Sequence, residues 1–168
     1  MPFTEAFLPE YDHEMSSTRR VLERLPEKNF AFKPHEKSMS LGQLASHLAE
    51  ITSWAGAITG SDSFDVAPPG GAPYKPPLYP TRQEVLRRFD ENVKAARGLI
   101  AGVNDSQSMK PWSLLKGGER VFTLPKGGVL RSMILNHSIH HRGQLTVYLR
   151  LNNVPLPQVY GPTADEGM

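Results

Sequence analysis

Three of the six histidines lie in one short stretch, residues 136–145, and two of them have a spacing suited to metal binding. His137 and His141 stand four residues apart, so on an α-helix they lie about one turn apart and roughly 40° around the axis. Two imidazoles placed in this way can bind one metal ion without bending the backbone. His47 lies far earlier in the chain. Our hypothesis is that His47, His137 and His141 meet around one metal ion.

Helical spacing alone does not decide which histidines of the stretch would bind. His137 and His140 are also neighbours on a helix, because they stand three residues apart. His140 and His141 point about 100° away from each other, so they are poorly placed to share an ion. On periodicity alone, either His140 or His141 can be the partner of His137.

Three neutral imidazoles are a suitable ligand set for zinc, nickel, copper or iron. Three protein ligands leave at least one position open for water, which is the arrangement of catalytic rather than structural zinc. We expect a divalent metal ion, zinc or nickel first, with iron or manganese as alternatives. The chain has no cysteine, which excludes thiolate ligands, disulfides and a cysteine nucleophile. Any thiol that takes part in chemistry must therefore arrive from outside.

Length and composition indicate one globular domain spanning residues 1–168. The net charge of +2 is too small and too evenly spread to favour a nucleic-acid partner. The first residues have no signal-peptide pattern, and no apolar run approaches the length of a membrane-spanning helix. We expect a cytoplasmic protein that binds a small-molecule substrate, and neither nucleic acid nor a membrane.

Apolar residues at helical spacing predict four long helices and therefore an all-α four-helix bundle with a long crossover. The predicted helices cover residues 3–25, 41–60, 81–103 and 127–151. Ser40 with Gln43, and Thr81 with Glu84, have the spacing of capping boxes that would begin the second and third helices. In the core of such a bundle, ligands from distant parts of the chain can meet.

Two connections differ from the helical segments. Residues 61–80 are rich in proline and contain two adjacent glycines, so we expect a crossover without any regular element. Residues 106–128 contain two short extended pieces around Gly117-Gly118. They predict a short hairpin before the last helix, with an extended loop as the alternative.

His47 lies on the apolar stripe of the second predicted helix, three residues after Leu44 and four before Ile51. A single histidine in such a place is usually a core residue, and the histidine pair of the last helix is what favours a ligand role. Glu50, one turn further on, is a candidate for orienting His47. Arg142 is another candidate for an orienting role, although we expect it to face solvent or an interface.

Two segments of the sequence resemble motifs of the DinB family, also called the DinB/YfiT-like superfamily. They are Leu41-Gly42-Gln43-Leu44-Ala45-Ser46-His47-Leu48 and Asn136-His137-Ser138-Ile139-His140-His141-Arg142-Gly143-Gln144-Leu145. The ending, residues 153–155 and 160–166, is similar to a branch of the same family. The resemblance covers the whole chain. It implies a four-helix bundle, a metal held by His47, His137 and His141 with His140 as a neighbour, and a homodimer.

The resemblance also implies a metal-dependent enzyme, because relatives of this family include thiol-dependent S-transferases and a thiol-dependent isomerase that use low-molecular-weight thiols. A metal held by histidines lowers the pKa of a bound water or thiol, so thiol transfer and metal-assisted hydrolysis both fit. The sequence places no general base, and the catalytic residues stay unassigned. The alternative is a non-catalytic module, in which the metal stabilises a fold for ligand binding or dimerisation.

Overall fold

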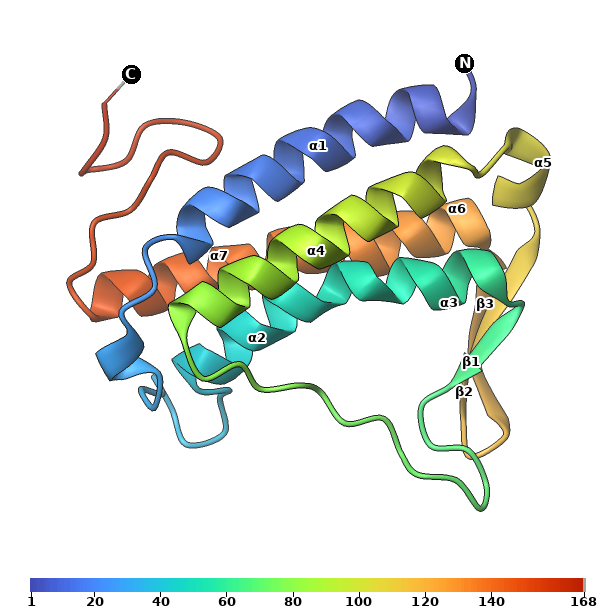
Figure 1. Ribbon diagram of the computed structural model, residues 1–168, viewed down its shortest axis with the longest axis horizontal. Helices are drawn as coiled ribbons and strands as arrows, with labels where there is room; N and C mark the ends of the chain where they lie inside the picture. Colours follow the sequence, from blue (N-terminus) through green and yellow to red (C-terminus); the bar gives the residue numbers. More distant parts are fainter. Residues whose placement is uncertain (168) are drawn as a thin grey trace.

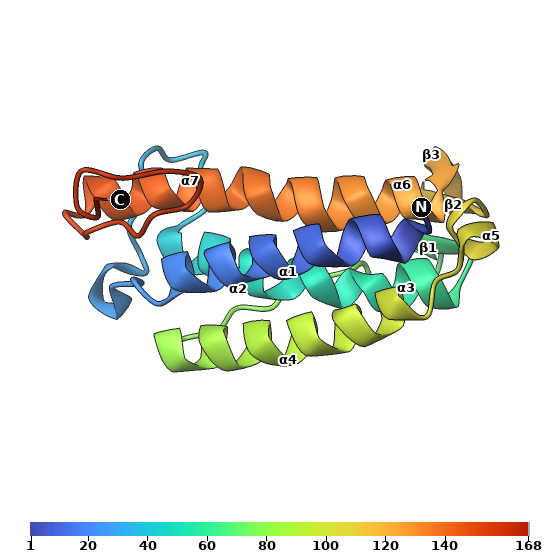
Figure 2. The ribbon, with the colours of Figure 1, turned by 90° about the horizontal axis from the view of Figure 1, so that it is seen from above.

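The long helices of this computed structural model, which describes residues 1–167, lie side by side as a bundle of four rods (Figures 1 and 2). The first and third rods are the single helices α1 (Phe3–Leu22) and α4 (Arg82–Ala101). The second rod joins α2 (Leu41–Ile51), η2 (Thr52–Trp54) and α3 (Ala55–Gly60), and the last joins α6 (Lys126–Val129), η3 (Leu130–Asn136) and α7 (His137–Leu151). Short helices η1 (Glu27–Asn29) and α5 (Asp105–Ser108) lie in connections. Met168, the last residue of the predicted domain, lies outside the described residues.

The four predicted helices are therefore present, and the second and third rods run in the same direction (Figure 1). Residues 61–80 run back along the bundle between them, as the predicted crossover requires. Helix α1 ends at Leu22, slightly before the predicted end, because a tighter turn follows in which Leu25 N donates to Leu22 O. Within residues 1–167, no helix combines the length and the apolarity that crossing a membrane requires.

Two helices begin at the polar residues that the sequence indicates. Ser40 Oγ accepts from Gln43 N at 3.2 Å, and Gln43 Oε1 accepts from Ser40 N at 2.8 Å, which confirms the first capping box. Thr81 Oγ1 accepts from Glu84 N at 3.1 Å and so caps α4. The Glu84 carboxylate lies 3.4 Å from the Arg87 guanidinium. The second capping box therefore lacks the return hydrogen bond from Thr81 N to the Glu84 side chain.

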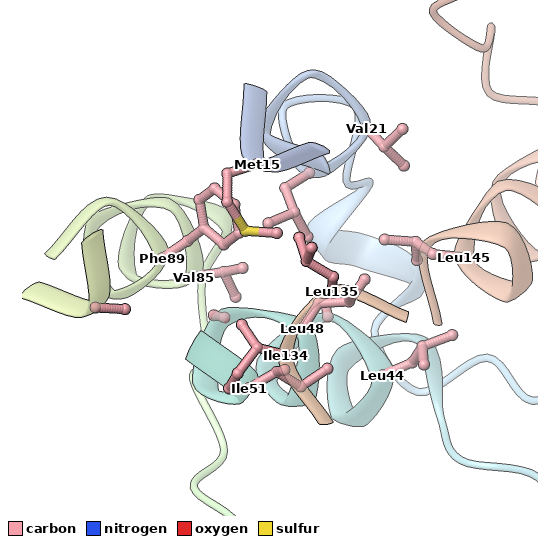
Figure 3. Close-up of a cluster of buried hydrophobic side chains, with 14 of the residues drawn as sticks. Met15, Val21, Leu44, Leu48, Ile51, Val85, Phe89, Ile134, Leu135 and Leu145 are labelled. Atoms are coloured by element: carbon pink, nitrogen blue, oxygen red, sulfur yellow. The ribbon is translucent and has the colours of Figure 1, made fainter. Parts of the chain in front are cut away.

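The core lies between the rods, each of which turns one apolar face inward (Figure 3). The labelled side chains come from every rod: Met15 and Val21 of α1, Leu44, Leu48 and Ile51 of α2, Val85 and Phe89 of α4, Ile134 and Leu135 of η3, and Leu145 of α7. Each of them is almost fully removed from water. This burial is the main favourable contribution to folding, and it fixes how each helix is rotated about its axis.

The expectation of an all-α fold holds for the helical bundle and is wrong for the connections, because the chain also forms a three-stranded sheet with the order β1-β2-β3. Strands β2 (Pro111–Lys116) and β3 (Glu119–Pro125) form the antiparallel hairpin that the sequence predicts. Gly117 and Gly118 occupy its turn with φ values of 66° and 81°, a conformation that glycine adopts without strain. Strand β1 (Ser63–Asp65) pairs in parallel with β2, so the expectation of no regular element in residues 61–80 is also wrong.

Strand β1 is held in place by tertiary contacts. The Asp65 carboxylate accepts hydrogen bonds from Gly117 N at 3.0 Å and from Gly118 N at 2.7 Å, which tie the crossover to the turn of the hairpin. Val66 N also donates to Leu115 O at 3.0 Å. A strand of three residues is too short to produce a periodic pattern, and for this reason the sequence does not reveal it.

The last rod covers the range that its periodicity predicts, but its middle part, η3, is π-helical. A π-helical segment is a widened turn that is rare in proteins and frequent at functional sites. Segment η3 ends at Asn136, directly before His137. It therefore sets the direction in which the histidines of α7 project.

Arg142 is buried inside the bundle, so the expectation of a solvent or interface position is wrong. It is 1% exposed, and its guanidinium lies 2.7 Å from the carboxylate of Glu14 on α1. Arg142 also donates to the Glu14 carbonyl at 3.1 Å and to the Tyr160 hydroxyl at 2.7 Å. Tyr160 brings the C-terminal tail back onto α1 and α7. The two buried charges are compatible with the core because they are paired and hydrogen-bonded.

Replacing Arg142 by alanine leaves the Glu14 carboxylate buried without its cation, so we expect the free energy of unfolding to fall by about 3–5 kcal/mol. Urea denaturation at neutral pH measures this loss. Arg131→Ala is the matched control, because Arg131 pairs with Glu10 on the surface, where the two side chains are 44% and 40% exposed. Exposed pairs contribute about 1 kcal/mol or less. Equal losses in the two variants would contradict a structural role for the buried pair.

Candidate metal centre

The packing of α2 against α7 brings three histidines together. His47 projects from α2, while His137 and His141 project from the first two turns of α7. The Nε2 atoms of His47 and His137 lie 3.2 Å apart, and those of His137 and His141 lie 2.7 Å apart. One nitrogen from each ring lies within 4.8 Å of the other two, and all three side chains are half-buried. This group could hold a metal ion.

His141, and not His140, joins the other two histidines. His140 is exposed, and its ring lies 4.9 Å from the His141 ring, on the outer side of α7. The other two histidines of the chain, His13 and His35, are also exposed. The structure thus brings together the residues that the sequence hypothesis names, while their role as ligands stays a prediction.

Gln144 orients one of the rings. The amide oxygen Oε1 of Gln144 lies 2.7 Å from Nδ1 of His141. Because an amide oxygen can only accept a hydrogen bond, this contact places the proton on Nδ1 and leaves the Nε2 lone pair free for a metal. Sequence reasoning assigned no role to Gln144. The signal was available, because residues three apart on a helix are neighbours.

Trp54 covers the histidines on one side. Its ring lies 5.6 Å from the ring of His47 and 5.3 Å from that of His137, measured between centroids. Trp54 ends η2, the short turn that joins α2 to α3. Nothing in the sequence pattern singled it out, because its role depends on the side-by-side arrangement of the second and last rods.

Burial keeps the imidazoles neutral. It lowers the pKa of His47 to about 4, with a smaller contribution from the nearby His141. Burial, followed by the charges of His141, His47 and His140, also lowers the pKa of His137 to about 4. The pKa of His141 is lowered by burial as well, and the hydrogen bond to Gln144 opposes this change. At neutral pH, His47 and His137 therefore have the uncharged form that binds metals.

The donor set fits a divalent transition metal. An uncharged imidazole that carries its proton on one ring nitrogen can bind a metal ion through the other, and the Nε2 atoms of the three rings lie close enough to share one ion. Imidazole ligands suit zinc, nickel, copper and iron, whereas manganese prefers oxygen ligands. Within residues 1–167, the group contains three possible ligands and no carboxylate. This ligand set does not select one metal among those that imidazole suits.

Glu50 does not contact His47 through a hydrogen bond, although it lies one turn further along α2. Its carboxylate accepts from Ser53 Oγ at 2.9 Å and from the Tyr79 hydroxyl at 3.3 Å. Burial and the nearby Glu50 charge raise the pKa of Tyr79 to about 12. Glu50 therefore belongs to a hydroxyl network beside the histidines and does not orient them directly.

A pocket of about 490 Å³ opens beside the histidines, and His47 forms part of its wall. The rest of the wall comes from the second rod, from η3, from strands β1 and β2, and from the crossover at Tyr74. The pocket is thus completed by the crossover and by the sheet, in which β1 pairs with β2. The sequence did not predict this pairing. A molecule bound in the pocket would lie against His47, one of the three histidines.

Removing the central ligand should remove the metal. The protein purified without a nickel column should contain about one equivalent of divalent metal, since three preformed imidazoles bind such ions. His137→Ala should lose it, whereas His140→Ala should keep it, because His140 points away from the group. Elemental analysis by mass spectrometry measures the content of each protein. Equal metal content in the two variants would rule out the assigned ligand set.

Gln144 should affect metal affinity without touching the metal. Gln144→Ala removes the acceptor of the His141 Nδ1 proton, and loss of such an outer partner weakens metal binding by about 10–100-fold. Gln144→Glu keeps an acceptor at the same place, so its affinity should stay near that of the unmodified protein or rise. Competition with a chromogenic chelator gives the affinities. An alanine variant that binds as tightly as the glutamate variant would show that this hydrogen bond has no orienting role.

Comparison with known proteins agrees with this fold. A model of the DinB family matches residues 1–167. The uncharacterized protein YrdA of Bacillus subtilis is 24% identical over 164 residues, which make up 95% of this chain and 89% of YrdA. The crystal structure of a DinB-like protein from Bacillus cereus has a TM-score of 0.72 and 22% identity, and the match covers 93% of this chain and 97% of that one.

A second crystal structure, of the DinB-like protein YjoA from Bacillus subtilis, has a TM-score of 0.63 and 17% identity. This match covers 95% of the present chain and 97% of YjoA. At these identities the two structures show a shared fold. The family model spans all but the last residue, and it confirms the resemblance seen in the histidine motifs, so the chain belongs to the DinB family.

Proposed function

We propose that this protein is a divalent-metal-dependent enzyme of the thiol-dependent S-transferase or hydrolase type. The observation that supports the proposal is the position of the three imidazoles: their nitrogens lie within 4.8 Å of one another, and His47 forms part of the wall of a pocket of about 490 Å³. Structural metal sites are usually closed by four protein ligands, whereas catalytic sites keep a position open. Three histidines beside a pocket match the second arrangement.

A divalent ion held here would supply Lewis acidity, which lowers the pKa of a ligand water or thiol toward neutrality. The chain's own groups prepare the site for this chemistry. Gln144 holds a proton on Nδ1 of His141, so Nε2 faces the other two histidines. Trp54 covers the rings of His47 and His137 and keeps bulk water away from that side. Burial keeps the rings of His47 and His137 uncharged at neutral pH, which is the form that binds metals.

The nucleophile must come from outside the chain. There is no cysteine in the sequence, so a thiol reaction requires a low-molecular-weight thiol as cosubstrate. In hydrolysis, water takes the same place. Both reactions need an electrophilic substrate in the pocket beside His47, and this common requirement is why the proposal includes both types.

Turnover should require both the metal and its central ligand. We expect protein loaded with zinc or nickel to accelerate either the reaction of cysteine with a chromogenic aryl halide or the hydrolysis of a nitrophenyl ester. His137→Ala should abolish the acceleration, and His140→Ala should retain it, because only the first removes a ligand. Absorbance of the released product measures the rates.

The non-catalytic alternative predicts a different result in the same experiment. In that case the metal would join α2 to α7, so its removal by a chelator would lower the melting temperature while no substrate was turned over. Bound metal and a metal-dependent melting temperature, with rates equal to those of His137→Ala for both substrates, would argue against the enzyme and for a metal-stabilised module.

A further inference from the structure

The pocket beside the histidines is lined by aromatic and aliphatic side chains. Trp54 of η2, Phe64 of β1, Tyr74 of the crossover and Trp112 of β2 all line it, and His47 forms the side that faces the other two histidines. Most of the remaining wall is aliphatic and includes Ile58, Val66, Leu114 and Met133. Flat aromatic molecules pack well against such rings, in offset-stacked or edge-to-face contacts.

The charged groups of the pocket are few and of one sign. The ionisable side chains of the wall are His47, Tyr74 and Glu50. The wall contains no lysine or arginine. The Glu50 carboxylate is held by two hydroxyls, those of Ser53 and Tyr79, neither of which neutralises its charge. A carboxylate, phosphate or sulfonate in the pocket would lose its hydration, gain no cationic partner from the wall and be repelled by Glu50.

An organic cation is also disfavoured. Aromatic rings with one carboxylate can attract an ammonium group. However, the same pocket borders the three-histidine group, and a divalent ion held there would repel a second cation at close range. An uncharged molecule meets neither penalty. The volume of the pocket, about 490 Å³, is suited to a small molecule, because pockets for such ligands commonly measure about 300–1,000 Å³.

We infer that the pocket binds an uncharged, apolar molecule with a flat aromatic part, and that it discriminates against anionic molecules of the same shape. This inference rests on the proposed function, in which such a molecule is the electrophilic substrate and its reacting atom lies toward His47. The anionic classes that the wall disfavours include nucleotides, sugar phosphates and carboxylic acids. Its neutral aromatic wall distinguishes this site from one built to recognise a phosphate or carboxylate group.

A pair of fluorescent probes tests the inference on the full-length protein without metal. N-phenylnaphthylamine is uncharged, and anilinonaphthalenesulfonate is the same ring system with one sulfonate added. We expect the neutral probe to bind with a blue-shifted emission and the sulfonate to bind roughly tenfold more weakly or worse at low salt, as one close repulsive charge predicts. The only two tryptophans, Trp54 and Trp112, both line the pocket, so energy transfer from tryptophan reports binding there.

Three variants locate the binding and explain the selectivity. Phe64→Ala removes part of the pocket wall, so it should weaken binding of the neutral probe about fivefold. The fold should be kept, because the Phe64 side chain is already 39% exposed. Leu78→Ala is the matched control, because Leu78 lies in the same crossover, is 65% exposed and does not line the pocket. Glu50→Gln keeps the size of the side chain and removes its charge, so it should reduce the difference in affinity between the neutral and the sulfonated probe.

Several results would overturn the inference. These are equal affinity for the neutral and sulfonated probes, or equal effects of Phe64→Ala and Leu78→Ala. Tyr74→Ala, outside any helix or strand, repeats the wall test if Phe64→Ala fails to fold. Because no metal is present, absence of catalysis does not affect these results. Conversely, failure of the probes to bind leaves the metal content and the proposed function to be judged separately.

Discussion

The contact between α2 and α7 is the constraint on which the site depends. Neither helix alone can bring three imidazole nitrogens within 4.8 Å, since His47 belongs to one helix and the other two histidines to its neighbour. Leu44 and Leu48, which are 1% and 0% exposed, flank His47 on α2. Rotating α2 to turn His47 away would expose these leucines to water, at a cost of about 1.5–3 kcal/mol for each. Apolar burial therefore fixes the position of the His47 imidazole.

On α7 the rotation is fixed by polar contacts as well. Arg142 follows His141 directly in the sequence, so its side chain leaves the helix about 100° away from that of the histidine. It enters the core toward α1 and meets Glu14, and the tail joins this pair through Tyr160. Buried charges tolerate little displacement, because a separated pair would lose both its Coulomb attraction and its hydrogen bonds. The ion pair on one face of α7 thus holds the histidines on another.

The small sheet completes the pocket beside the histidines and contributes apolar side chains to its wall. Its strands carry Phe64 and Trp112 into the pocket wall. A hydrogen bond of 3.2 Å from the indole N–H of Trp112 to Ala57 O fixes Trp112 against the second rod. The crossover adds Tyr74 and is tied to the hairpin by Asp65. A rigid helical scaffold therefore places the three histidines, while connecting segments shape the pocket beside them.

The sequence by itself determined the four long helices, the Ser40 cap and the hairpin, because helical periodicity, capping and turn chemistry act between residues only a few positions apart. It could not choose between His140 and His141 without the family motif, since both are helical neighbours of His137. Tertiary structure alone decided the pairing of β1, the burial of Arg142, the shield formed by Trp54 and the apolar pocket. Each of these depends on groups that are distant in the chain, and a local pattern contains no information about which distant partner a side chain will meet.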